Sequence, residues 1–139
     1  MQYNSLTLSV GDRKRGFMFI QGQEAFQSKP AESGTIAKAS RITSGTLSKT
    51  ACYKKDGVVT VSGMLTNISV SGNGNFFTIP TGFRPVSATF GYALLAYTSD
   101  TKPIPWVCEI DTSGNVKIAH SSATADTAYF FATYGVGIS

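Results

Sequence analysis

The stretch that decides the fold of this chain is Thr78-Ile79-Pro80-Thr81-Gly82-Phe83-Arg84-Pro85. The two prolines each hold φ near about −65° and restrict the residue before them, and Gly82 permits a conformation that other residues resist. An apolar run from Ala88 to Tyr97 follows. Its composition would also suit a buried helix, but the preceding Pro85 and the internal Gly91 favour a strand. The sequence therefore predicts a rigid corner that feeds a long strand.

A hairpin is predicted upstream of this corner. Asp56-Gly57 separates two β-rich runs, Thr46–Tyr53 and Val58–Met64. Asp-Gly between such runs is a strong hairpin signal, because both central residues of a type I′ turn need positive φ. We expect the two runs to pair as antiparallel strands.

Downstream of the corner, turn and strand signals continue to alternate. Ser99–Pro105 is expected to be a loop, because Pro103 and Pro105 bar regular ladder pairing. A strand at 106–110, a turn at 111–115 and a returning strand at 116–120 follow. The aromatic-rich segment 128–138 is predicted to close the chain as a strand inside the sheet.

These signals predict an all-β fold with one main domain. About ten short strands at roughly 8–12-residue spacing, with no amphipathic helix, are typical of an antiparallel β-sandwich or a jelly-roll-like barrel. The first strands are expected at Leu6–Val10 and Phe17–Ile20. The strand-like pattern of apolar residues fades towards Pro30. We therefore divide the chain into residues 1–33, a strand and linker segment, and residues 34–139, the sandwich.

Composition narrows the possible partners. Charged residues make up 14% of the chain, against about 25% in typical soluble domains. A surface rich in Ser, Thr, Gly and Tyr suits hydrogen bonding to glycans, but it also suits dense β-structure without any ligand. The net charge of +4 comes from scattered residues, with local clusters only at 13–15 and 54–55. Because nucleic-acid binders need a clustered basic stripe, no nucleic-acid partner is expected.

Metals, cofactors and membranes are not expected either. Cys52 and Cys108 are far apart and belong to no C-x-x-C pair; each suits a buried small hydrophobe, and their spacing leaves a disulfide between them open. His120 is the one histidine, so no zinc-like cluster or catalytic triad motif accompanies it. The chain opens without a signal-peptide pattern and has no apolar run of the roughly 20 residues that span a membrane.

Few residues offer chemistry, and each has a structural alternative. Trp106 can stack on a sugar ring or seal the end of a sandwich. His120 and Tyr97 offer polar groups beside a loop, or belong to strand ends. Asp111 can bind a ligand, act with Glu109 as a carboxylate pair in glycoside hydrolysis, or cap its own turn. The carboxylate pair lacks the rest of a catalytic constellation, so we do not expect an enzyme. The phenylalanines, Phe90 included, are expected in the core.

Four segments in series carry a resemblance to a known family. They are Asp56-Gly57-Val58-Val59-Thr60-Val61, then Ile79-Pro80-Thr81-Gly82-Phe83-Arg84-Pro85, then Trp106 to Ile110, and then Ser113-Gly114-Asn115-Val116 before the closing strand. This pattern resembles the head domains of phage tail-fibre and baseplate receptor-binding proteins. The corner is its distinctive element, and the remainder is generic β-structure.

The resemblance implies a homotrimeric β-knob at the tip of a phage or prophage tail. Such heads recognise saccharides or teichoic-acid-like polymers on the bacterial host. Our own candidates for glycan-binding residues are Trp106, His120, Asp111, Tyr97 and Arg84. A second interpretation of Arg84 is that it caps a loop carbonyl. Residues 1–33 would be a shoulder or neck towards other tail proteins, and the protein would be made in the bacterial cytoplasm and reside in the virion. A structural assembly module without a ligand and a glycan-degrading enzyme are the alternatives.

Overall fold

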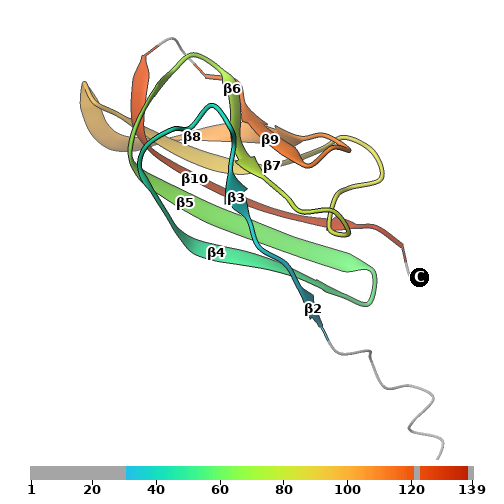
Figure 1. The fold of residues 1–139 in the computed structure, drawn as a ribbon. Coiled ribbons are helices and arrows are strands. Elements are labelled where there is room, and N and C mark those ends of the chain that lie inside the picture. The colour runs from blue at the N-terminus through green and yellow to red at the C-terminus, as the bar shows by residue number, and fades with distance from the viewer. Residues whose placement is uncertain (1–30, 121–122, 138–139) are drawn as a thin grey trace, which may run out of the picture. The chain divides into compact units, whose positions relative to one another are not determined.

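The computed structural model describes residues 31–120 and 123–137, and within them it shows strands and no helix (Figure 1). The strands are β2 (Glu32–Ser33), β3 (Ala37–Lys38), β4 (Thr46–Lys55), β5 (Val58–Ser71), β6 (Gly74–Thr78), β7 (Thr89–Tyr97), β8 (Asp100–Ile110), β9 (Asn115–Ile118) and β10 (Thr124–Gly135). The expected strands at 6–10 and 17–20, and nearly all of the predicted segment 1–33, lie outside the described residues.

All nine described strands belong to one antiparallel sheet in the order β2-β4-β5-β10-β7-β8-β9-β6-β3. The sheet curls, so that β6 and β3 come to lie across from β5 and β4 (Figure 1). The prediction of an all-β antiparallel fold is confirmed.

One short segment holds both ends of this sheet. β2 pairs with β4 at one end and β3 pairs with β6 at the other, although only residues 34–36 separate them. The backbone N–H of Gly34 donates to the carbonyl of Cys52 at 2.9 Å, and that of Ala39 donates to the carbonyl of Phe76 at 3.0 Å. The segment at residues 32–38 therefore bridges β4 and β6 with two strands of two residues each.

The Asp56-Gly57 hairpin is confirmed. Asp56 and Gly57 have φ of 53° and 77°, as a type I′ turn requires. The turn joins β4 to β5, whose register runs from Lys55 opposite Val58 back to Thr46 opposite Thr66. A local demand for positive φ, readable in the sequence, thus sets the pairing of the two strands.

The corner at residues 79–85 carries the chain from β6 to β7. The N–H of Phe83 donates to the carbonyl of Pro80 at 3.2 Å, and Gly82 has φ of 97°, which together make a tight turn around Gly82. Phe83 is buried, and the hydroxyl of Tyr134 donates to its carbonyl. Because β8 and β9 lie between β6 and β7 in the sheet, the corner carries the chain past the ends of β8 and β9.

The predicted loop at 99–105 is wrong for all but Ser99, since residues 100–105 form the first half of β8. Pro105 lies opposite Leu94 and Ile104 lies opposite Leu95 on β7. β9 pairs only with Cys108, Glu109 and Ile110, which leaves the other edge of residues 100–107 without a strand among the described residues. Proline is tolerated where its missing N–H faces such a free edge.

The inside of the curl is filled by aromatic and branched side chains. Phe77 from β6 packs on Phe130 from β10 with ring centroids 4.5 Å apart. Gly63 makes room for this pair, because a Cβ there would lie 3.2 Å from the Phe77 ring. Cys52 and Cys108 are both buried free thiols, and burial raises the pKa of Cys108 to about 11.

Candidate functional site

Three of the five predicted site residues come together at one end of the sheet. The ring of His120 lies 5.8 Å from that of Tyr97 and 6.4 Å from that of Trp106, measured between centroids. The Tyr97 hydroxyl is 3.4 Å from Nδ1 of His120, and the ring of Phe76 completes the cluster at 5.6 Å. The cluster joins β6, β7 and β8 to the segment after β9.

This cluster is interior rather than a binding surface. Tyr97 is 5% exposed and His120 is 9% exposed, so neither can contact a large ligand. Burial lowers the pKa of His120, and the charge of Arg41 lowers it further, while the Gly72 backbone opposes both. Neutral His120 is therefore a core residue, and the prediction that it and Tyr97 bind a glycan finds no exposed surface to rest on.

Asp111 caps the turn between β8 and β9. Its Oδ1 accepts hydrogen bonds from the N–H groups of Ser113 at 2.9 Å and Asn115 at 3.0 Å, and its Oδ2 accepts one from Asn115 Nδ2 at 3.0 Å. Partial burial tends to raise the pKa of Asp111, but these hydrogen bonds and the nearby Arg84 charge outweigh it and lower the pKa. The carboxylate is committed to the turn.

Arg84 is likewise engaged by the backbone. Its Nε donates to the carbonyl of Ile79 at 2.9 Å, which ties the last part of the corner to its first part. Gly114, in the turn capped by Asp111, abuts this side chain, since a Cβ there would lie 2.6 Å from Arg84 Nε. Arg84 and Asp111 thus form a second group, built around the corner and the β8–β9 turn.

The exposed aromatic residues lie instead on the outer face of the sheet. We use outer face for the side that carries Phe90, Tyr92, Val107, Tyr129 and Phe131. Phe90 is 68% exposed, Tyr92 is 51% exposed and Val107 is 59% exposed. Cross-strand pairing aligns Phe131, Tyr92 and Val107 in one row over β10, β7 and β8. The expectation that Phe90 belongs to the core is wrong, because it alternates with the inward Gly91 on β7.

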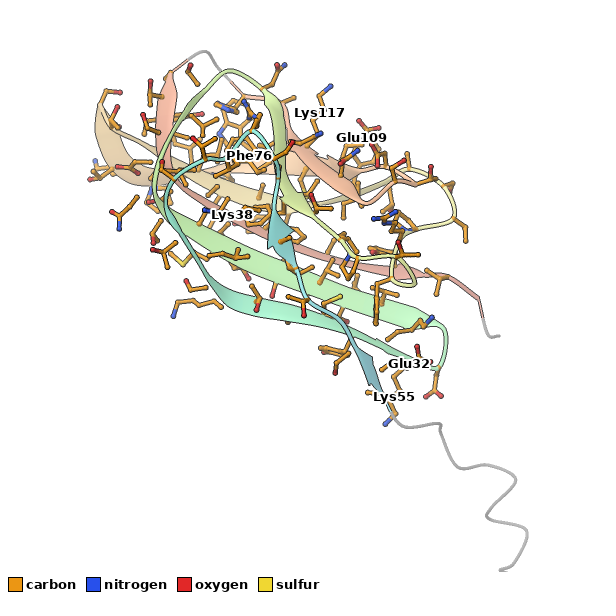
Figure 2. All side chains as sticks on the ribbon, in the orientation of Figure 1. Glu32, Lys38, Lys55, Phe76, Glu109 and Lys117 are labelled. Carbon is orange, nitrogen blue, oxygen red and sulfur yellow. The ribbon has the colours of Figure 1, made fainter. Side chains whose placement is uncertain are left out.

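A hollow of about 420 Å³ opens at the β9 end of the outer face. Phe90, Val107, Glu109 and Lys117 line it, together with Pro105, Trp106 and Ala119. Glu109 lies opposite Phe90 on one side and opposite Lys117 on the other, so these three side chains share a row across β7, β8 and β9. Figure 2 shows Glu109 and Lys117 close together on neighbouring strands. Of the predicted residues, only Trp106 borders this hollow.

Sequence reasoning missed Phe90, Val107 and Lys117, although a signal was present. Phe90, Tyr92 and Leu94 alternate with smaller residues, and Val107 and Glu109 alternate with Trp106 and Cys108. Period-two alternation identifies residues that share a face. It does not say which face is buried, and that depends on the direction in which the sheet curls.

A polar hollow of about 330 Å³ between β3 and β6 offers less chemistry. Lys38 and Arg41 line it, but the Arg41 guanidinium donates to backbone carbonyls, the shortest bond being 2.7 Å to Asn75. Lys38 Nζ donates to the carbonyl of Gly45 at 3.3 Å. Both cations therefore serve loops rather than a free anion site.

Residues 31–120 and 123–137 contain no group of three or more His, Cys, Asp or Glu side chains arranged to hold a metal ion. In the same residues no helix is long and apolar enough to cross a membrane. Comparison with known proteins returned no matching family model and no matching curated protein.

Proposed function

We propose that this chain is the head of a phage or prophage tail receptor-binding protein that binds a saccharide on the bacterial surface without catalysing a reaction. The observation that carries the proposal is the group of solvent-exposed aromatic and apolar side chains on the outer face: Phe90 is 68% exposed, Val107 59% and Tyr92 51%. The hairpin and corner of the sequence resemblance support it, since both have the expected local geometry.

The chemistry of the outer face suits sugars. An aromatic ring presents a negative π face, which complements the slightly positive C–H groups of a pyranose. Phe90 has such a ring in the open beside two polar side chains, Glu109 and Lys117, that can serve hydroxyl groups. The hollow between them falls within the ~300–1,000 Å³ typical of small-molecule sites.

The proposal extends to assembly. By the resemblance, the curled sheet forms a sandwich or jelly-roll-like knob that trimerises at the tail tip, with residues 1–33 leading towards other tail proteins. The low charge of the chain, 14%, agrees with a surface that is partly covered by other copies.

A glycan array tests the saccharide proposal, with adsorption to host cells as a second readout. Phe90→Ala should weaken both signals by about tenfold or more. Tyr53→Ala is the matched control, because Tyr53 is an exposed aromatic residue on β4, away from the hollow. Absence of any glycan signal, together with unimpaired cell adsorption by the Phe90 variant, would count against saccharide binding.

A structural assembly module is the second candidate, and one observation favours it. An apolar hollow of about 270 Å³ on the other half of the outer face is lined by Met64, Leu94, Pro103, Tyr129 and neighbouring residues. Such a surface suits packing against protein better than binding sugar. Tight binding to a purified tail protein of the same particle, with no adsorption to cells, would favour this candidate.

A further inference from the structure

We infer that the hollow beside Phe90 is a subsite for one neutral pyranose residue, with adjacent hydroxyl groups recognised by Glu109 and Lys117. The inference rests on the proposed saccharide function and adds to it the location and the chemical class of the ligand. It also moves the site away from the sequence candidates Tyr97, His120, Asp111 and Arg84.

Phe90 provides the stacking surface. Its ring lies on β7 in the same row as Glu109, so a sugar stacked on the ring lies beside that carboxylate. Phe90 has no polar atom of its own and contributes only its apolar face. Val107, two residues before Glu109 on β8 and therefore on the same side, extends the apolar floor of the hollow.

Glu109 and Lys117 provide the polar edge. They are direct cross-strand partners, which places their Cβ atoms about 4.5–5.5 Å apart. Both side chains are exposed, and the salt bridge found in the described residues is that of Lys54 with Glu32 instead. A carboxylate accepts from two hydroxyl groups, and an ammonium donates to hydroxyl oxygens. Together they match neighbouring hydroxyls, each of which donates one bond and accepts another.

The pairing of opposite charges argues for a neutral ligand. A uronic acid or a phosphate-bearing polymer would gain from Lys117 but would bring its anion against Glu109. A positively charged amino sugar would meet the reverse conflict. Since like charges at such distances oppose binding, a neutral sugar is the class that both side chains accept.

The experiment is competition for binding of the full chain to host envelope, using methyl glycosides of neutral sugars and the methyl glycoside of glucuronic acid as probes. We expect a neutral glycoside to compete and the glucuronide not to compete at the same concentration. Phe90→Ala and Glu109→Gln should each weaken envelope binding by about tenfold, and Lys117→Met should do the same, while Tyr53→Ala should not. Circular dichroism of each variant checks the fold.

Three results would overturn the inference while leaving the proposed function intact. Envelope binding that is competed by sugars but unchanged in both the Phe90 and Glu109 variants places the site elsewhere. Competition by the glucuronide alone, lost in Lys117→Met and kept in Glu109→Gln, assigns an acidic sugar. Unchanged binding in Lys117→Met with loss in Glu109→Gln removes Lys117 from the site. By contrast, the saccharide function itself is rejected if the chain binds the envelope but binds no sugar on the array and no sugar among the probes competes.

Discussion

At the scale of single residues, Gly91 decides how closely three strands approach. A Cβ at this position would lie 2.7 Å from the Ala132 Cβ, 2.8 Å from the Phe131 carbonyl oxygen and 2.9 Å from the Cys108 sulfur. Two of these neighbours belong to β10 and one to β8, on either side of β7. Only glycine allows this contact between the central strands.

We therefore expect Gly91→Ala to destabilise the protein by about 1–3 kcal/mol through overpacking. Gly135→Ala is the control, because a Cβ there meets its nearest atom at 3.8 Å. Urea unfolding followed by tryptophan fluorescence measures both variants. Equal midpoints for the two variants would contradict the close packing at Gly91.

His120 makes stability depend on pH in a defined direction. Its pKa in the folded state is lowered, chiefly by burial, so between the folded-state pKa and the unfolded value of about 6.5 the unfolded chain binds more protons. Stability is then full above about pH 6.5 and falls as pH drops through the folded-state pKa. Arg41, whose guanidinium lies 4.8 Å from the Phe76 ring, is the charged group facing the cluster.

The measurement is the urea midpoint of wild type and His120→Phe between about pH 7.5 and pH 5, around the histidine range. Wild type should lose stability over this interval, and the variant should show a flatter profile. Because His120 is the one histidine in the chain, its ring signal in a proton NMR titration reports the folded-state pKa without overlap. A folded-state pKa at or above about 6.5 would contradict the burial effect.

At the scale of elements, the sequence predicts what local backbone chemistry dictates. Asp56-Gly57 needs positive φ, and the Pro80–Phe83 turn needs it at its third residue, Gly82, so both are readable without knowing the neighbours. Two other features can be predicted only when the arrangement of the strands in the sheet is known. Pro103 and Pro105 fit in β8 because residues 100–107 have no strand along their other edge within the part of the chain that the structure describes. Phe90 and Phe76 differ in burial only because the sheet curls away from one and around the other.

Pro103 and Pro105 should also protect the edge of β8 that no described strand covers. An exposed strand edge can pair with a strand of another chain. Proline has no backbone N–H, so it cannot donate the hydrogen bond that such pairing needs. We expect the double variant Pro103→Thr, Pro105→Thr to self-associate into larger, β-rich species, measured by light scattering and thioflavin fluorescence over time. Thr101→Val raises β-propensity in the same stretch but keeps both prolines, and it should behave as wild type. Equal solubility of the double variant and wild type would show that the edge is protected otherwise.

At the scale of the whole molecule, the outer face carries two surfaces of different character. One half has the hollow with Glu109 and Lys117, and the other has the apolar hollow of Met64, Leu94 and Tyr129. The candidate site could not be predicted from sequence because it combines residues from β7, β8 and β9, whose side-by-side arrangement follows from the corner and the curl. Of the predicted residues, Trp106 alone borders it.

We expect the apolar hollow to lie at the contact between copies in the proposed trimer. Light scattering of the full chain at micromolar concentration should show the trimer mass, and Leu94→Asp should shift the protein towards the monomer by placing a charge in an apolar contact. Val86→Asp, at an exposed position outside the hollow, should leave the mass unchanged. A monomeric wild type would contradict the trimer.

The bridging segment at residues 32–38 has a mechanical consequence. A pulling force applied to the chain at Ala31 enters the domain through β2 and β3, each only two residues long, before it reaches any long strand. Those two pairings would unzip first and detach the segment from β4 and β6, while the pairing of β5 with β10 and of β7 with β8 stays outside the load path. Under tension such a domain would open first at the bridging segment, and the pairings of β2 with β4 and of β3 with β6 would re-form when the tension ends.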